Sequence, residues 1–149
     1  MSQRRIVITG MGIISSLGDN VETYWQNIMA GKSGIGPITR FDVAGYSTVI
    51  AGEIGDFEPD KYIDGREAKR MDRFSQFAMA AAAQAVGQSG LDFASEDSYA
   101  CGVLIGSGIG GLSEVESQVL RLAEKGPERV SAFLVPKLMI NAASGLISI

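Results

Sequence analysis

Short apolar runs and longer helical stripes alternate along the chain. The runs at 5–9 and 101–106 lack the alternation of a half-exposed strand, so they predict strands covered on both faces. A weaker run at 48–54, interrupted by Gly52, predicts a peripheral strand. Apolar residues at helical spacing predict helices at 20–30, at 72–89 and around Val115, Val119 and Leu122. This alternation favours an α/β fold, with a parallel-rich sheet and covering helices.

Polar residues mark where these helices begin. Asp19 with Glu22, and Ser113 with Glu116, have the spacing of capping boxes, in which side chains satisfy free backbone N–H groups of the first turn. Asp72 is a single cap for the long helix. The inner face of that helix is rich in alanine, so another backbone can pack closely against it, and we expect it at the centre of the molecule. This face contains Phe74, Phe77, Ala78, Ala81, Ala82, Ala85 and Val86.

The loop after the run at 101–106 contains four glycines, at 106, 108, 110 and 111. A strand, a glycine loop and a helix often build a ligand site in α/β proteins, because glycine lets the backbone approach a ligand closely. The loop matches the G-x-G-x-x-G pattern of dinucleotide binding, but the acidic residue expected about twenty residues later is absent. A dinucleotide-binding domain is therefore kept only as an alternative.

Composition narrows the class of protein. The chain has 149 residues, of which 46% are hydrophobic and 20% charged, the balance of a globular domain with a core. Its net charge of −4 argues against general nucleic-acid binding. The N-terminus lacks the long apolar core of a secretory signal, and no run is long enough to span a bilayer. These features predict a cytoplasmic protein that binds neither nucleic acid nor membrane.

Residues that commonly carry catalysis are few. The chain contains no histidine, which excludes a Ser-His or Cys-His nucleophile pair and histidine-containing zinc sites. Cys101 is the only cysteine, and it opens its predicted strand, whereas ligands bind beyond the carboxyl ends of parallel strands. We therefore predict that Cys101 is a small buried core residue.

A basic cluster stands out from the acidic background. Arg66, Lys69, Arg70 and Arg73 follow the i, i+3, i+4, i+7 spacing, so they would share one face of a helix. Spacing alone favours a solvated face, and an acidic partner is the alternative.

The C-terminal stretch predicts an interrupted helix. Pro136 suits a first helical turn, and the apolar residues that follow stop at Ile149 without a cap. We therefore expect 1–149 to be part of a larger domain. We also expect the isolated chain to be unstable, because Leu138, Ile140, Leu146 and Ile147 would lack partners.

Five motifs together resemble the N-terminal part of the type II 3-oxoacyl-[acyl-carrier-protein] synthases. They occur in matching order along essentially the whole chain, and isoleucine at 109 favours type II over type I. The motifs are IVITGMGIIS at 6–15, GKSGI at 31–35, KRMDRF at 69–74, IGSGIGGL at 105–112 and SAFLVP at 131–136.

The resemblance implies a thiolase-like fold and a decarboxylating Claisen condensation. In that family a cysteine takes an acyl chain from acyl carrier protein, and the carbanion from malonyl-carrier protein attacks the thioester. The nucleophilic cysteine and two histidines would lie beyond Ile149, so the segment alone is predicted to be inactive. The resemblance implies a homodimer when complete, with no cofactor and no metal. A non-catalytic module that binds carrier protein or pairs with a synthase is the alternative.

The resemblance also assigns binding roles to six residues. Ile109 aligns with the gate of the acyl tunnel, and Phe133 and Leu134 align with a segment that reaches the acyl pocket of the neighbouring subunit. The carrier-docking patch aligns with Arg66, Lys69 and Arg70, whereas Glu128 stands where relatives often carry a second basic contact.

Overall fold

The computed structural model describes residues 5–149, so the first four residues, which begin the N-terminus predicted to lack a signal, lie outside the described part. Six α-helices, two short 3-10 turns and two short strands make up this part of the chain. The helices are α1 (Val21–Met29), α2 (Gly65–Ala68), α3 (Arg73–Ser89), α4 (Leu112–Lys125), α5 (Leu134–Leu138) and α6 (Ala142–Ser148). The turns are η1 (Pro59–Lys61) and η2 (Pro127–Arg129), and the strands are β1 (Gly36–Pro37) and β2 (Ile50–Ala51).

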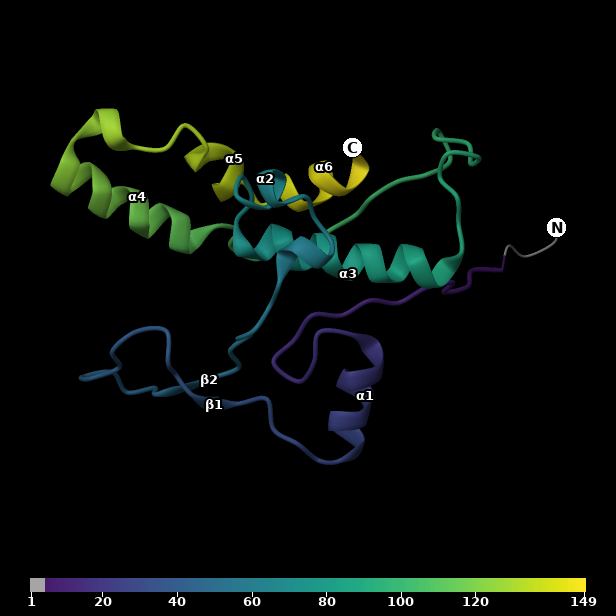
Figure 1. Ribbon diagram of the computed structural model, residues 1–149, viewed down its shortest axis with the longest axis horizontal. Coiled ribbons are helices and arrows are strands. Elements are labelled where there is room, and N and C mark those ends of the chain that lie inside the picture. The colour runs from purple at the N-terminus through teal and green to yellow at the C-terminus, as the bar shows by residue number, and fades with distance from the viewer. Residues whose placement is uncertain (1–4) are drawn as a thin grey trace.

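Helix α3 is the central element of the molecule. In Figure 1 it runs lengthwise, with α2 and α6 along one side and the α1 and β1–β2 region along the other. Ala80 of α3 and Ala143 of α6 are both fully buried, so these two helices pack closely. A small apolar cluster of Ile63, Ala68 and Met71 lies against this pair, with Leu146 of α6 packed on it. The predicted central position of the long helix is confirmed, but its predicted inner face is not the buried one: the buried residues of α3 are Ser75 and Ala80, whereas Val86 is 40% exposed.

The close backbone approach predicted from the alanines of α3 is confirmed too. The glycines at 10 and 12 lie directly against it, since a Cβ at Gly10 would overlap the Ala85 carbonyl and one at Gly12 the Ala81 carbonyl. Two glycines facing two alanines let an extended segment run along a helix at backbone distance.

The helix termini agree only in part with the predicted caps. Asp72 caps α3 as expected, because its carboxylate accepts a hydrogen bond of 3.2 Å from the Phe74 N–H. Asn20, rather than Asp19, caps α1, with its side-chain oxygen 2.8 Å from the Thr23 nitrogen. The capping box predicted at Ser113 is wrong, because α4 begins at Leu112 and Ser113 already lies inside the first turn. The helix ends before Gly126, whose φ of 79° stops it.

The predicted parallel-rich sheet is absent from residues 5–149. The sheet there is a single antiparallel pair, in which Gly36 faces Ala51 and Pro37 faces Ile50, so the run at 48–54 forms only a two-residue edge strand. The runs at 5–9 and 101–106 are extended but join no ladder. A strand is stabilised by hydrogen bonds to a neighbouring strand, and the described residues supply none to these two runs.

Two burial predictions and one helix prediction are also wrong. Cys101 is exposed rather than in the core. The apolar stripe of α1 is largely open, with Trp25 58% and Met29 69% exposed. The predicted terminal helix divides into α5 and α6, because the backbone becomes extended at Met139. The break lets α6 fold back onto α3.

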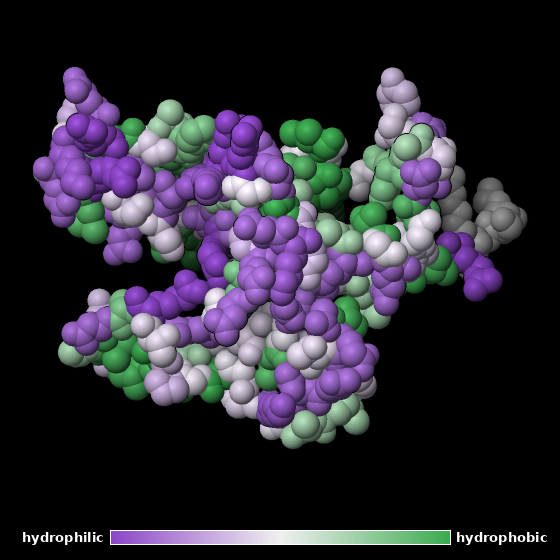
Figure 2. All heavy atoms as spheres, in the orientation of Figure 1, coloured by the Kyte–Doolittle hydropathy of each residue, from purple (hydrophilic) through white to green (hydrophobic). Residues whose placement is uncertain are grey.

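Apolar side chains reach the surface in many places. Figure 2 shows several separate apolar patches among polar residues on one face of the molecule. Leu104 is 97% exposed and Ile6 96% exposed, and both belong to the unpaired extended runs. Among the described helices, none has both the length and the apolar character that crossing a bilayer requires.

Candidate functional site

The end of the glycine loop packs against the end of α5. Gly110 has a φ of 79°, and a Cβ there would overlap the Leu138 carbonyl. A Cβ at Gly111 would overlap the Lys137 carbonyl, and the Gly111 N–H donates a hydrogen bond to the Leu138 oxygen at 3.3 Å. Both positions therefore require glycine, for backbone conformation at Gly110 and for space at both.

This packing argues against the dinucleotide-binding alternative. In that fold the glycines make room for a pyrophosphate at the helix N-terminus. Here the last two glycines make room for the backbone of α5, whose carbonyls occupy the space that a pyrophosphate would need.

The other side of the loop is open. A Cβ built at Gly106 or Gly108 would meet no atom within 4 Å. Ile109 lies between this open half and the packed half, and 65% of it is exposed. An apolar side chain in this position is free to contact an alkyl ligand or a neighbouring chain.

Three residues of the basic cluster lie together on and just after α2. Arg66, Lys69 and Arg70 are all exposed. Asp64 caps the helix by accepting a 2.9 Å hydrogen bond from the Arg66 N–H, and Arg70 pairs with Glu67 at 3.3 Å. The surface is therefore cationic but partly neutralised by its own acidic residue.

Arg73 does not share this face, contrary to the helical spacing. The chain turns between Lys69 and Asp72, so Arg73 begins a different helix. Its guanidinium donates to the Ile54 carbonyl at 3.2 Å and lies 5.0 Å from the ring centre of Phe77. Burial, together with the nearby Arg40 charge, lowers the pKa of Arg73. Arg73 is thus a structural residue.

Arg70 connects the basic cluster to the segment at 131–134. Its guanidinium carbon lies 5.5 Å from the centre of the Phe133 ring, within the range of a cation–π contact. Phe133 is 43% exposed and immediately precedes α5, which begins at Leu134, a half-buried residue. The structure therefore joins two groups that the sequence treated separately. Ile109 belongs to the opposite end of α5, where the glycine loop packs.

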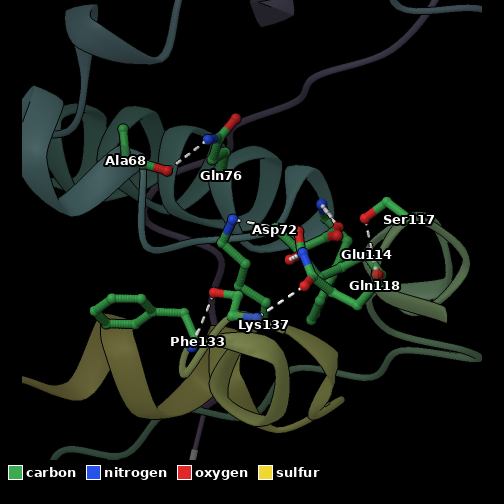
Figure 3. Close-up of polar contacts among 10 residues, drawn as sticks. Ala68, Asp72, Gln76, Glu114, Ser117, Gln118, Phe133 and Lys137 are labelled. Atoms are coloured by element: carbon green, nitrogen blue, oxygen red, sulfur yellow. Dashed lines mark hydrogen bonds and ion pairs between the residues drawn. The ribbon is translucent and has the colours of Figure 1, made fainter. Parts of the chain in front are cut away.

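A half-buried polar network, missed from the sequence, ties α4 to α5 (Figure 3). Lys137 Nζ lies 3.3 Å from Glu114 Oε2, and Gln118 Nε2 donates to Glu114 Oε1 at 2.9 Å. Gln118 is only 6% exposed, and its own oxygen accepts a 2.8 Å hydrogen bond from the Ser131 N–H. The i, i+4 spacing of Glu114 and Gln118 was readable in the sequence, but Lys137 is 23 residues away from Glu114.

A second basic surface was also missed. Arg121, Lys125 and Arg129 line a shallow hollow of about 530 Å³ between the end of α4 and η2. Arg121 and Lys125 have the i, i+4 spacing that places them on one helix face. Arg129 reaches the same hollow from the next turn.

Comparison with protein families gives a match along almost the whole chain. The family model described as "Beta-ketoacyl synthase, N-terminal domain" matches residues 3–149. Curated relatives include the protein named 3-oxoacyl-[acyl-carrier-protein] synthase 2 from Synechocystis sp., 44% identical over 149 residues, and that from Coxiella burnetii, 46% identical. The same protein from Staphylococcus aureus is 47% identical over 150 positions. Each match covers 100% of this chain but 36% of the relative.

Solved structures share the fold. The ishigamide ketosynthase/chain length factor superposes with a TM-score of 0.81 at 34% identity, covering 99% of this chain and 37% of that one. A beta-ketoacyl synthase from Burkholderia phymatum gives 0.78 at 21% identity over 98% of this chain and 36% of its own. A type II PKS ketosynthase solved in complex with its acyl-carrier protein gives 0.79 at 23% identity, covering 98% and 38%. The described part of the chain therefore shares its fold with the corresponding part of these ketosynthases, which is consistent with the predicted α/β class.

Proposed function

Because the chain belongs to the beta-ketoacyl synthase family, we propose that it supplies the carrier-docking and acyl-binding part of a 3-oxoacyl-[acyl-carrier-protein] synthase of type II. Identity of 44–47% along the full chain to synthases with this activity is the observation that carries the proposal. The reaction is a decarboxylating Claisen condensation, which extends an acyl thioester by two carbons from malonyl-carrier protein. Acyl carrier protein is the partner, and acyl and malonyl thioesters are the substrates.

Docking begins at the cluster of Arg66, Lys69 and Arg70. Exposed cations attract an acidic protein over a distance and orient it, so they contribute mainly to the rate of encounter and to specificity. Arg70 then lies against Phe133, which connects the docking surface to the segment of the acyl pocket. The hollow of Arg121, Lys125 and Arg129 offers a second cationic contact and offsets the acidic Glu128.

Acyl binding falls to Ile109, Phe133 and Leu134. Ile109 is apolar, exposed and flanked by glycines, which suits a gate that swings while touching an alkyl chain. The complete enzyme is proposed to be a homodimer, in which Phe133 and Leu134 would reach the pocket of the neighbouring subunit, as the resemblance to the synthase family implies.

The chemical step requires residues that this chain lacks. It has no histidine to stabilise the carbanion or the thioester oxygen, and its one cysteine lies in an extended run outside the proposed pocket. The chain spans about 36% of the length of its curated relatives. Residues 1–149 would therefore be inactive alone, and the rest of a synthase would supply the nucleophilic cysteine and both histidines.

The rest of a synthase would also complete the fold. The extended runs at 5–9 and 101–106 would then become strands of the parallel-rich thiolase-like sheet, since each has free backbone groups and apolar side chains. Residues 1–149 would form one partial domain of that larger unit. The cytoplasm is the proposed location, where a lone exposed thiol such as Cys101 stays reduced.

The alternative is a non-catalytic module that binds carrier protein or pairs with an intact synthase. The absence of histidine together with an exposed basic cluster favours it. Carrier binding without condensation, even after the chain is joined to the rest of a synthase, would support this alternative.

Carrier binding by the 149-residue chain tests the docking proposal. We expect Arg66→Glu with Lys69→Glu to weaken binding of acyl carrier protein at least about tenfold, because two attractive charges become repulsive. Arg5→Glu with Lys32→Glu is the matched control, because it reverses the same number of charges outside the cluster of Arg66, Lys69 and Arg70. Equal loss in both variants, or none in either, would contradict docking at this cluster.

A further inference from the structure

We infer that Lys137 is a positioning residue, which with Glu114 fixes the base of the loop that carries Ile109. The moving part of the gate is then restricted to residues 106–109, with its pivot at Gly110. This inference rests on the proposed function of Ile109, and it concerns how that gate is held.

The Glu114–Lys137 ion pair differs from the other two pairs in the described part of the chain. Its side chains are 14% and 19% exposed, whereas those of Lys61–Glu58 and Arg70–Glu67 are all more than half exposed and only three residues apart. Exposed pairs at this spacing contribute little, because water screens them. A half-buried pair that joins two helices is screened less and holds their relative position.

Glu114 is held on both sides, which makes the pair part of a rigid unit. One carboxylate oxygen faces Lys137 and the other accepts from Gln118 (Figure 3). The Gln118 side-chain oxygen in turn accepts a hydrogen bond from the backbone N–H of Ser131, at the start of the segment that leads into α5. The first half of α4 is therefore held at two places: Gln118 bonds to Ser131, which lies before α5, and Glu114 pairs with Lys137, which lies within α5.

The glycine loop meets this unit at its last two residues. The carbonyls of Lys137 and Leu138 occupy the space beside Gly111 and Gly110, so this half of the loop cannot slide without moving α5. The first half of the loop has open space around Gly106 and Gly108. Gly110, with its φ of 79°, lies at the boundary and is the natural pivot.

Loosening the pair would let the pivot itself move. Without the Lys137 charge, Glu114 keeps only its hydrogen bond from Gln118. The hydrogen bond from the Gly111 N–H to the Leu138 carbonyl would then open more often, because the ion pair no longer holds α4 and α5 together. Ile109 would then occupy a wider range of positions. A gate that is held less firmly discriminates less sharply between acyl chains of different length.

Amide hydrogen exchange tests the structural half of this inference, in a synthase formed by joining residues 1–149 to the remaining part of the Staphylococcus aureus relative. We expect Lys137→Met to speed exchange of the Gly111 N–H at least about fivefold, since local opening sets that rate. Lys137→Arg keeps the positive charge and leaves the Glu114–Gln118 hydrogen bond in place, so it should retain slow exchange. Lys61→Met removes an exposed pair and serves as the control. Unchanged exchange at Gly111 in Lys137→Met, or equal acceleration in Lys137→Arg, would overturn the inference.

The functional half is tested in a synthase formed by joining residues 1–149 to the remaining part of the Staphylococcus aureus relative. We expect Lys137→Met to flatten the ratio of kcat/KM between short and long acyl substrates, and Lys137→Arg to preserve it. Faster exchange at Gly111 without any change in this ratio would overturn the positioning role. If Ile109→Gly also leaves the ratio unchanged, the gate proposal fails as well, so the two failures are distinguishable.

Discussion

Arg70 shows how much a single residue can connect. It belongs to the exposed basic cluster, pairs with Glu67 and stacks over Phe133. Sequence spacing identified Arg70 as part of a cationic face, and the resemblance identified Phe133 as a pocket residue. Their contact links positions 63 residues apart, so no local pattern could reveal it.

Replacing Arg70 with lysine separates its charge from its stacking. Lysine keeps the charge, but it lacks the flat guanidinium that stacks over an aromatic ring. We expect Arg70→Lys to keep most of the carrier affinity and to lower the free energy of unfolding by roughly 0.5–1 kcal/mol. Chemical denaturation measures this. If Arg70→Lys is equally costly in a Phe133→Leu background, the stacking contact contributes nothing.

Ile109 can be tested by removing its side chain. Because the residue is 65% exposed, Ile109→Gly should change the free energy of unfolding little. In the joined synthase it should alter the preferred acyl length, since one apolar side chain provides roughly 1.5–3 kcal/mol of contact. The measurement is kcat/KM across a series of acyl-carrier substrates. The same acyl preference before and after the substitution would contradict the gate.

Elements held by local interactions were predictable, and those held by distant ones were not. Helix α3 follows from its apolar stripe and from Asp72, which lies one residue before it. The prediction of a parallel sheet was wrong for the described residues, because a strand needs a neighbouring strand to bond to and no described residue pairs with 5–9 or 101–106. The position of Arg73 was missed because the i, i+7 spacing from Arg66 assumes one continuous helix, whereas the chain turns between α2 and α3.

Gly12 tests the close packing on α3. A methyl group at this position would overlap the Ala81 carbonyl, so we expect Gly12→Ala to destabilise the chain by about 1–3 kcal/mol. Gly87, inside α3, has open space beside it, and Gly87→Ala should stabilise by roughly 0.5–1 kcal/mol through its better helix propensity. Thermal melts of the two variants compare them directly. Similar changes in stability in Gly12→Ala and Gly87→Ala would show that the backbone at Gly12 does not lie close to α3.

We predict that the loop after β1 responds to pH through Glu53. Its carboxylate accepts hydrogen bonds from the Thr39 hydroxyl at 2.7 Å and from the backbone N–H groups of Thr39 and Arg40, and these lower the pKa of Glu53. A lowered pKa means that stability is present above the ordinary glutamate pKa of 4.5 and is lost as pH falls through the folded value. We expect the protection factor of the Thr39 amide, which corrects for the slower intrinsic exchange in acid, to fall as pH falls, and to depend less on pH in Glu53→Gln. An identical acid response in Glu53→Gln would contradict this.

At the scale of the whole molecule, the exposed apolar surface is the main feature. Extended runs with Leu104 and Ile6 almost fully exposed lie beside a small core built on α3. Surfaces of this kind drive association with other chains. The sequence predicted that apolar residues of the terminal helix would lack packing partners. Ile140 is 51% exposed, as predicted, whereas Leu146 packs against the apolar cluster of Ile63, Ala68 and Met71.

Stability measurements test this feature. We expect the isolated 149-residue chain to melt broadly and to form concentration-dependent oligomers, as measured by calorimetry and analytical ultracentrifugation. Mixing it with the remaining part of the Staphylococcus aureus synthase should sharpen the melt, because a partner that binds only the folded form stabilises it. A sharp melt of a soluble monomer would contradict the expectation.

The central claim is that this chain is the docking and acyl-binding part of a condensing enzyme. The most direct test is the joined synthase, supplied with acyl- and malonyl-carrier protein and assayed by mass spectrometry for 3-oxoacyl-carrier product and for carbon dioxide release. We predict one carbon dioxide per product from the joined enzyme, an at least about tenfold lower kcat/KM for carrier substrates in Arg66→Glu with Lys69→Glu, and no product from residues 1–149 alone. A folded joined enzyme that binds carrier protein but forms no product would contradict the claim.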